Sequence, residues 1–384
     1  MKSEWSNKKI KDVVDIRRGA SPRPIHNFLA NNGMPWVKIA DATADSSRYL
    51  WKTNEYIIYE GIKKSVVVEP ETLIVSNSAT PGLPKIMKIT ACVHDGWLVF
   101  SNYRGITRDF LYYKFIDIRR KLVNQANGSV FQNLKTDIVK DFDIDIPSIQ
   151  TQNKIVDILS RLDDKIELNN AINENLEQQA LALFSNYYEH STTEVGFTDL
   201  IQVLGGGTPK TGERTYWNGN IPFFTPKDID CPYTLATEKT ITDDGLSHCN
   251  SRLYPVNTVF VTARGTVGKV GIAGVPMAMN QSCYALIGKG IHQLLAYFYT
   301  LKVVDRLKHK ASGAVFDAII TKDFETEQVV KLFPNDADTF IKIAEPMYQF
   351  ILNNSIENQR LIALRNSLLP KLMSSELDVS GIQL

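Results

Sequence analysis

The chain has 384 residues, 43% of them hydrophobic, and a formal net charge of +1. This length leaves room for two or three domains, and the apolar content excludes wholesale disorder. No run approaches the ~18 apolar residues needed to span a bilayer. The near-balanced charge argues against a strongly acidic mimic of a nucleic acid, and it means that any nucleic-acid binding would rest on a local basic surface.

The N-terminal residues and the cysteines predict a cytoplasmic chain. The first twelve residues are basic, but no apolar run follows them, so a signal peptide is not expected. The four cysteines are scattered without a CxxC pair, which is typical of structural thiols in a reducing compartment. They are Cys92, Cys231, Cys249 and Cys283.

Residues 1–147 predict a first globular domain of mixed α+β type. Short β-type runs alternate with Gly, Pro and Asn turns, as in residues 56–59 and 65–68. Residues 148–190 follow as a long helical segment, with Pro147 standing just before it. Over residues 149–184 the apolar positions alternate in steps of four and three, which is a heptad seam.

Residues 191–334 repeat the first domain, and residues 335–384 repeat its helix. Pro22 and Pro209 lie 187 residues apart, and so do Asp41 and Asp228. Residues 73–76 match 259–262 at an offset of 186, and 128–131 match 313–316 at 185. Because one register holds over several separated blocks, we interpret the chain as a tandem repeat.

The two helical segments carry matching seams and are expected to pair antiparallel as a coiled coil. Asparagines at seam positions would set register and orientation at some cost in stability. Their offset is 185 if Asn169 matches Asn354, or 184 if it matches Asn353. Pro346 is expected to kink the second helix and Pro370 to break its last turns. The predicted seam residues are Ile155, Leu159, Leu162, Ile166, Asn169, Asn173, Leu176, Leu183, Met347, Ile351, Asn354, Asn358, Leu361 and Leu368.

The motifs of catalysis are absent or degenerate. Residues 263–270 resemble a phosphate-binding loop, but Ala263 replaces its first glycine and Val270 its Ser/Thr. The histidines do not pair at metal-ligand spacing, and no nucleophile elbow is present. We also find no Asn/Asp-Pro-Pro-aromatic tetrapeptide of the kind that amino-methyltransferases use. No cofactor or metal is therefore expected in this chain, which is interpreted as a binding protein and not an enzyme.

The order of the motifs resembles the specificity subunits of type I restriction–modification systems over nearly the whole chain. The family's repeated phrases are similar to residues 207–210, 216–223, 265–269 and 141–147 of this sequence. The first domain departs from the pattern, with residues 77–82 in place of the loop at 264–269, and residues 335–339 lack the usual proline-rich phrase. The resemblance implies two target-recognition domains, each followed by a long spacer helix.

The same resemblance implies partners and a division of labour. The chain would bind double-stranded DNA at a two-part site, with one half-site per domain. Two modification subunits would bind S-adenosylmethionine and methylate adenine, and a restriction subunit would cleave and translocate. Two rival interpretations remain: a self-contained methyltransferase or nuclease with degenerate motifs, and a scaffold or DNA mimic.

Contacts with DNA need Lys, Arg and small polar side chains at loop tips. Trp36, Trp217 and Phe223 are expected in the core and not against bases. The predicted DNA-binding residues of the first repeat are Arg17, Arg18, Arg23, Lys38, Asn77, Ser78, Thr80, Lys85, Gln132, Asn133 and Lys135. Those of the second repeat are Lys210, Thr211, Arg214, Lys227, Arg264, Thr266, Lys269 and Gln281.

Overall fold

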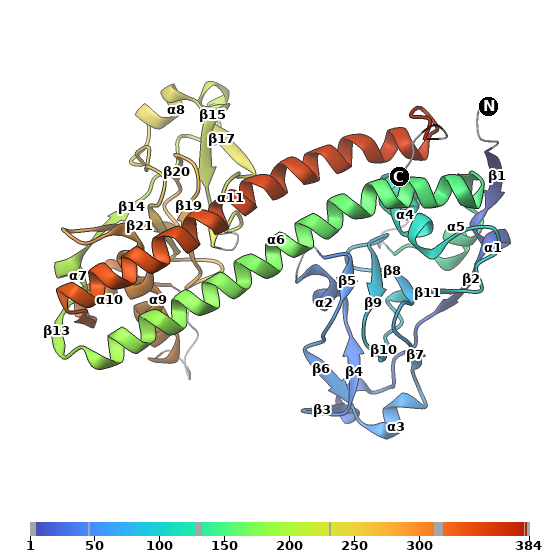
Figure 1. Ribbon diagram of the computed structural model, residues 1–384, viewed down its shortest axis with the longest axis horizontal. Helices are drawn as coiled ribbons and strands as arrows, with labels where there is room; N and C mark the ends of the chain where they lie inside the picture. Colours follow the sequence, from blue (N-terminus) through green and yellow to red (C-terminus); the bar gives the residue numbers. More distant parts are fainter. Residues whose placement is uncertain are drawn as a thin grey trace. The chain divides into compact units, whose positions relative to one another are not determined.

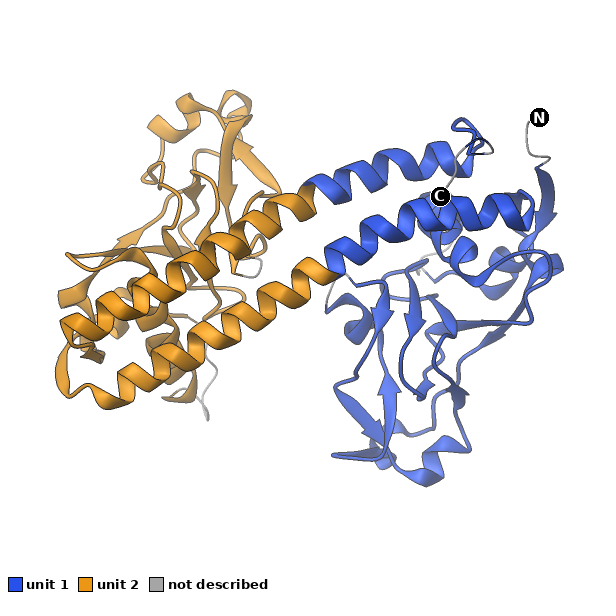
Figure 2. Ribbon diagram, viewed as in Figure 1, with its two compact units in different colours: residues 1–167, 360–384 blue, residues 168–359 orange. Residues whose placement is uncertain are grey.

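The structure, a computed structural model, describes residues 5–44, 47–126, 133–229, 232–310, 318–379 and 381. It divides into two compact units, residues 1–167 with 360–384, and residues 168–359 (Figure 2). Two long helices, α6 (Ile149–His190) and α11 (Pro334–Met373), each contribute to both units (Figure 1).

The first unit combines short strands with one long covering helix. Its helices are α1 (Ile10–Val13), η1 (Ile25–Asn27), α2 (Ile39–Thr43), α3 (Tyr59–Ile62), α4 (Arg108–Ala126) and α5 (Thr136–Lys140). Its strands are β1 (Ser6–Lys9), β2 (Asp15–Arg18), β3 (Leu29–Ala30), β4 (Met34–Val37), β5 (Tyr49–Leu50), β6 (Glu55–Ile57), β7 (Val66–Val68), β8 (Leu73–Ser76), β9 (Pro84–Met87), β10 (Ala91–Val93), β11 (Trp97–Ser101) and β12 (Asp143–Ile146).

The second unit likewise combines short strands with one long covering helix. Its helices are α7 (Phe197–Leu200), η2 (Arg214–Tyr216), α8 (Asp243–Ser247), α9 (Gln293–Lys310) and α10 (Thr321–Thr326). Its strands are β13 (Thr193–Gly196), β14 (Ile201–Gly205), β15 (Trp217–Phe224), β16 (Tyr233–Thr234), β17 (Lys239–Ile241), β18 (Val259–Thr262), β19 (Val270–Ala273), β20 (Ala278–Met279), β21 (Cys283–Gly288) and β22 (Gln328–Lys331).

The principal sheets of the two units have the same topology. The strand order is β2-β11-β8-β9-β5 in the first unit and β14-β21-β18-β19-β16 in the second. The registers agree as well: Leu73 faces Ile86, and Val259 faces Ile272, each 186 residues further on. The α+β class and the tandem repeat predicted from the sequence are therefore confirmed.

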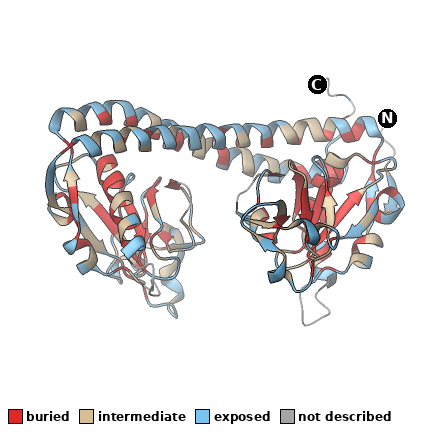
Figure 3. Ribbon diagram, turned by 90° about the horizontal axis from the view of Figure 1, so that it is seen from below, coloured by how far each residue is buried: buried red, intermediate tan, exposed pale blue. Residues whose placement is uncertain are grey.

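A long helix and part of the coiled coil cover each principal sheet. Strand β8 reads Leu-Ile-Val-Ser and is buried along its whole length, as expected for a central strand rich in β-branched residues. Helix α4 buries Phe110 and Phe115 against this sheet, together with Leu159 of α6. In the second unit α9 and α11 bury Phe298 and Phe340 in the same way. Figure 3 shows the buried residues in red, and many of them lie on the central strands of each unit.

The long helices run antiparallel in each unit taken by itself, as predicted. In the second unit Asn169 Nδ2 donates to Asn358 Oδ1 at 2.9 Å. Asn354 Nδ2 donates to Asn173 Oδ1 at 2.8 Å. Leu168 is exposed whereas Leu352 is buried, so the offset of 185 is the structural one. The asparagines thus pair crosswise between equivalent positions of the two repeats.

None of the predicted seam residues lies at the exposed surface. The buried ones are Ile155, Leu159, Ile166, Asn169, Ile351 and Asn358. The half-buried ones are Leu162, Asn173, Leu176, Leu183, Met347, Asn354, Leu361 and Leu368.

Two prolines predicted to disturb the second long helix lie within α11. Helix α11 continues through Pro346, and it ends at Met373, three residues after Pro370. Both prolines are exposed, so each ring faces solvent and its missing N–H costs one hydrogen bond on the open side of the helix. Packing of the opposite face, which includes buried Ala344 and Tyr348, stabilises the helix across this gap. Helix α6 ends at His190, the last residue of the helical segment predicted over residues 148–190.

Candidate nucleic-acid interface

A loop with the same closure follows the central strand of each repeat. In the first unit the N–H of Gly82 donates to the carbonyl of Ser76 at 2.8 Å. In the second the N–H of Gly268 donates to the carbonyl of Thr262, also at 2.8 Å. Both glycines have φ near +75°, a conformation that favours glycine. The Ser76 and Thr262 hydroxyls each donate to a carbonyl across the loop.

The two loops present different side chains. In the loop of the second repeat Arg264, Thr266 and Lys269 are all exposed. In the first repeat Ser78 and Thr80 are half-buried at the equivalent tip. Of the two loops, the second therefore presents cations that could contact the phosphate backbone of a nucleic acid.

A second pair of loops lies beside the first. Gly19 and Gly206 approach neighbouring backbone so closely that a Cβ would lie about 2.1 and 2.2 Å from a carbonyl oxygen. These close approaches are why the turns need glycine at these positions. In the second repeat the Thr208 hydroxyl donates to Gln281 Oε1, and the Thr266 hydroxyl donates to the Pro226 carbonyl at 3.2 Å.

These contacts bring four predicted residues of the second repeat together: Lys227, Arg264, Thr266 and Gln281. The N–H of Arg264 reaches the carbonyl of Ser282, next to Gln281, at 3.3 Å. Lys210, Thr211 and Arg214 are exposed in the segment that follows Thr208. Trp217 Nε1 donates to the Lys210 carbonyl at 3.3 Å and so ties that segment to β15.

The charges of the two repeats are arranged differently. Over the described part of the chain, no ion pair is found for the cations predicted in the second repeat, and all of them are exposed. In the first repeat Arg18 and Arg23 lie 3.7 and 3.3 Å from Asp95 Oδ2. Lys38 pairs with Glu55, and Arg17 donates to the Val67 carbonyl at 3.1 Å. The second repeat thus presents more uncompensated positive charge.

Two predictions for the first repeat are wrong. Lys85 is only 3% exposed and donates to the Ser47 carbonyl. Asn77 is 4% exposed, and its amide donates to the Asp95 carbonyl at 3.1 Å. A side chain enclosed in this way cannot reach a DNA groove without moving its neighbours. Both residues support the loop and are not its contact surface.

The segment after α4 borders this loop. The N–H of Leu134 donates to the Asn77 carbonyl at 2.7 Å, so the exposed residues Asn133 and Lys135 flank the first loop. The predicted residue Gln132 lies outside the described residues. In the second repeat the N–H of Ile319 makes the equivalent bond to the Ala263 carbonyl at 2.9 Å.

Asp95 was not predicted from the sequence as a site residue. It accepts a hydrogen bond from Ser21 and forms ion pairs with Arg18 and Arg23. Its only sequence indication is the offset of 186 to Gln281, because the residues around the two positions differ. Trp36 and Phe223 are buried, as expected of core residues.

The resemblance of residues 263–270 to a phosphate-binding loop is not supported. Strands β18 and β19 on either side of the loop pair antiparallel, so the segment is a hairpin. No helix begins after it to supply the N-terminal N–H groups of a phosphate site. The described residues contain no group of three or more His, Cys, Asp or Glu side chains that could hold a metal ion. None of the helices among them is long and apolar enough to cross a membrane.

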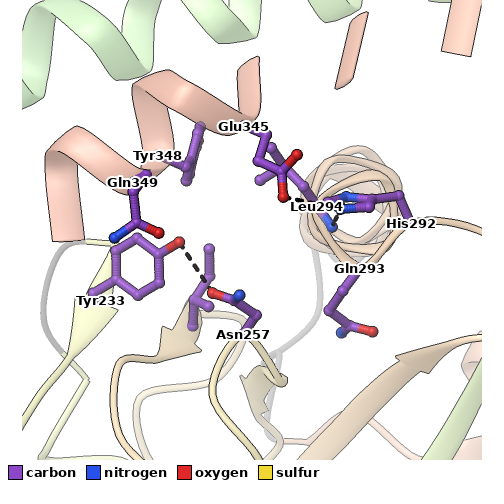
Figure 4. Close-up of a pocket in the computed structure, with 9 residues that line it drawn as sticks. Tyr233, Asn257, His292, Gln293, Leu294, Glu345, Tyr348 and Gln349 are labelled. Atoms are coloured by element: carbon purple, nitrogen blue, oxygen red, sulfur yellow. Dashed lines mark hydrogen bonds and ion pairs between the residues drawn. The ribbon is translucent and has the colours of Figure 1, made fainter. Parts of the chain in front are cut away.

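A cavity of about 90 Å³ lies where the second globular domain meets α11 (Figure 4). Tyr233 donates to Asn257 Oδ1 at 3.2 Å on one side, and His292 lies 3.4 Å from Glu345 on the other. Burial raises the pKa of Tyr233. A cavity of about 210 Å³ occupies the equivalent place in the first unit, with Ile86 where the second has Ile272. The repeated cavities therefore belong to the joint between each domain and its helix, and not to the loops.

A family model matches both halves of the chain. Residues 2–178 and 192–366 both match the family described as type I restriction modification DNA specificity domain. The chain is 24% identical to the specificity subunit of the type I restriction enzyme MjaIX of Methanocaldococcus jannaschii, over 99% of this chain and 95% of that one.

Two further proteins extend the comparison. The chain is 23% identical to the HindI specificity subunit of Haemophilus influenzae, over 86% of this chain and 84% of that one. The crystal structure of a type I restriction–modification S subunit from M. genitalium matches with a TM-score of 0.58 and 15% identity. That match covers 98% of this chain and 97% of that chain, and it supports the shared fold.

Proposed function

Because the chain belongs to the family of type I restriction–modification DNA specificity proteins, with two copies of the specificity domain, we propose that each unit reads one half of a bipartite DNA site. The observation that carries this proposal is the repeated loop closure at Gly82 and Gly268. Each unit has its own pair of neighbouring loops, so each can form a complete reader.

Exchange of one domain tests this proposal. Replacing residues 1–147 by the corresponding segment of a relative should change one half of the methylated motif and keep the other half and the gap. The measurement is sequencing of methylated bases in cells that carry the chimaera with its modification subunits. A chimaera that alters both halves would contradict the assignment of one half-site to each domain.

Affinity for DNA should fall steeply between about 50 and 200 mM salt, because phosphate contacts by Lys and Arg release counterions.

Arg264→Ala should weaken binding and reduce the salt slope by about one unit if Arg264 contacts a phosphate. If it reads a base, the variant should lose about 1–3 kcal/mol of discrimination at one position. The measurement is fluorescence anisotropy with labelled duplex. Lys342→Ala removes an exposed cation from α11 and serves as the matched control; equal behaviour of both variants would remove Arg264 from the interface.

We propose that methyl transfer belongs to two modification subunits that bind S-adenosylmethionine, and cleavage to a restriction subunit. The match of both halves of the chain to a DNA specificity domain supports a chain that supplies recognition. The purified chain is expected to show no methyl transfer, nuclease or ATPase turnover alone, and methylation is expected when modification subunits are added. Cofactor-dependent turnover by the chain alone would favour the rival interpretation as a self-contained enzyme.

A further inference from the structure

One position makes the same contact in both repeats with different chemistry. Asp95 precedes β11 and Gln281 precedes β21, 186 residues apart. The hydroxyl of Ser21 donates to Asp95 Oδ1 at 2.6 Å. The hydroxyl of Thr208, the equivalent residue of the second glycine–Ser/Thr–Pro turn, donates to Gln281 Oε1. The repeats thus share the bond, but one uses a carboxylate and the other an amide.

In the first repeat this carboxylate holds two arginines. Arg23 lies 3.3 Å and Arg18 3.7 Å from Asp95 Oδ2, and Arg18 Nε also donates to the Asp95 carbonyl at 2.7 Å. The hydrogen bond from Ser21 and the neighbouring Arg18 hold the pKa of Asp95 below its usual value, so it is ionised at neutral pH. Both guanidinium groups stay exposed, Arg23 by 80%. A guanidinium has five donors, so each retains free N–H groups for a ligand.

Among the described residues of the second repeat, no cation is found hydrogen-bonded to the equivalent side chain, Gln281. Gln281 is exposed, and its oxygen is the atom that accepts from Thr208. Over the described residues, no partner is found for its amide nitrogen, which is left to donate to a ligand.

A carboxylate on a surface that approaches DNA is repelled by the phosphates. We therefore expect the Asp95 carboxylate to have a function that offsets this unfavourable energy. The turn itself does not need the charge, because the amide of Gln281 makes the same bond in the other repeat. The two guanidinium groups do need the charge, because Arg23 donates to Asp95 Oδ2 at 3.3 Å and Arg18 lies at ion-pair distance, 3.7 Å, from the same oxygen. Arginine reads guanine through O6 and N7, and glutamine reads adenine through N6 and N7.

We propose that this shared position sets the base that each domain reads: Asp95 positions Arg18 and Arg23 toward a guanine of the first half-site, and Gln281 contacts an adenine of the second. The inference rests on the proposed function and adds a residue-level assignment to it. Asp95 is a positioning residue, because it acts through the arginines.

Sequencing of methylated bases tests both parts in the assembled complex. Asp95→Asn keeps an oxygen for Ser21 and removes the charge, so it should reduce discrimination at one guanine by about tenfold or more. Arg23→Ala or Arg18→Ala should relax the same position, whereas Asp95→Glu should preserve it in part. Gln281→Glu should relax one adenine in the other half-site. Exchange of residues 1–147 assigns the halves to the domains.

Matched controls are available in each unit. Asp141→Asn removes a carboxylate that bridges Lys11 and Lys9, and Gln202→Glu changes an exposed glutamine of β14; both should leave the motif unchanged. Full discrimination in Asp95→Asn while an arginine variant relaxes, or an unchanged motif in Gln281→Glu, would overturn the inference. So would a wild-type first half-site without guanine. A wild-type complex with no defined bipartite motif would instead contradict the proposed function.

Discussion

A matched insertion of four residues in each long helix, after Glu174 in α6 and after Asn353 in α11, is expected to abolish methylation of the original site. The new site should keep both half-site sequences with a gap longer by one or two base pairs. Four helical residues add about 6 Å, and each base pair rises about 3.4 Å. They also turn the helix by slightly more than one full turn, so the seam is only mildly disturbed.

The insertion must be matched because the helices run antiparallel. Asn173 pairs with Asn354, and an insertion in α6 alone would shift every later residue of α6 against α11. Glu177, which accepts from Tyr297 at 3.3 Å, would be among the residues displaced. We expect this unmatched variant to lose stability and methylation altogether. Sequencing of methylated bases checks both variants, and a matched insertion that alters bases within a half-site would show that the helices do not set the gap.

The second large effect is expected at the joint between the first domain and the long helices. Asp163 of α6 is 4% exposed, and it accepts from Tyr113 and from Arg365 of α11, each at 2.6 Å. Arg365→Ala would leave this carboxylate buried without its counter-ion. Such a change costs about 3–5 kcal/mol. Thermal unfolding should therefore show the transition of the first unit lowered by roughly 6–15 °C.

An exposed ion pair on the same helix provides the control. Arg161 lies 2.9 Å from Asp157, and its side chain is 63% exposed. Arg161→Ala should cost less than about 1 kcal/mol, because solvent screens the pair. If Arg365→Ala and Arg161→Ala lower the unfolding temperature equally, the buried ion pair between Asp163 and Arg365 does not stabilise the first unit more than an exposed pair does.

The second domain is joined to its helix by different chemistry. Tyr348 takes the place of Asp163 at the offset of 185, and Ala180 stands where the first unit has Arg365. Tyr348 packs against Tyr297 and Phe298 with ring centroids 5.7 and 5.6 Å apart. We therefore expect the stability of the first joint to depend on charge more strongly than that of the second.

The sequence by itself determined the features that local periodicity and short-range geometry encode. The heptad pattern predicts both long helices and their seam, because a stripe of apolar residues must be buried. The Gly/Pro turns after Gly19 and Gly206 can be recognised as short motifs, and the constant offset between the halves predicts two similar domains. These are properties of segments, so they can be seen before any long-range contact is known.

Only the tertiary structure decided which side chains meet. Ser21 and Asp95 are 74 residues apart, and they meet because β2 and β11 pair as neighbours. Lys85 is enclosed because β9 lies between β8 and β5. This strand order cannot be predicted from the residue types of β9. Pro346 is tolerated because the packed face of α11 outweighs one lost hydrogen bond. Partners of this kind depend on strand order and on the balance between packing and local preference, which a single sequence does not specify.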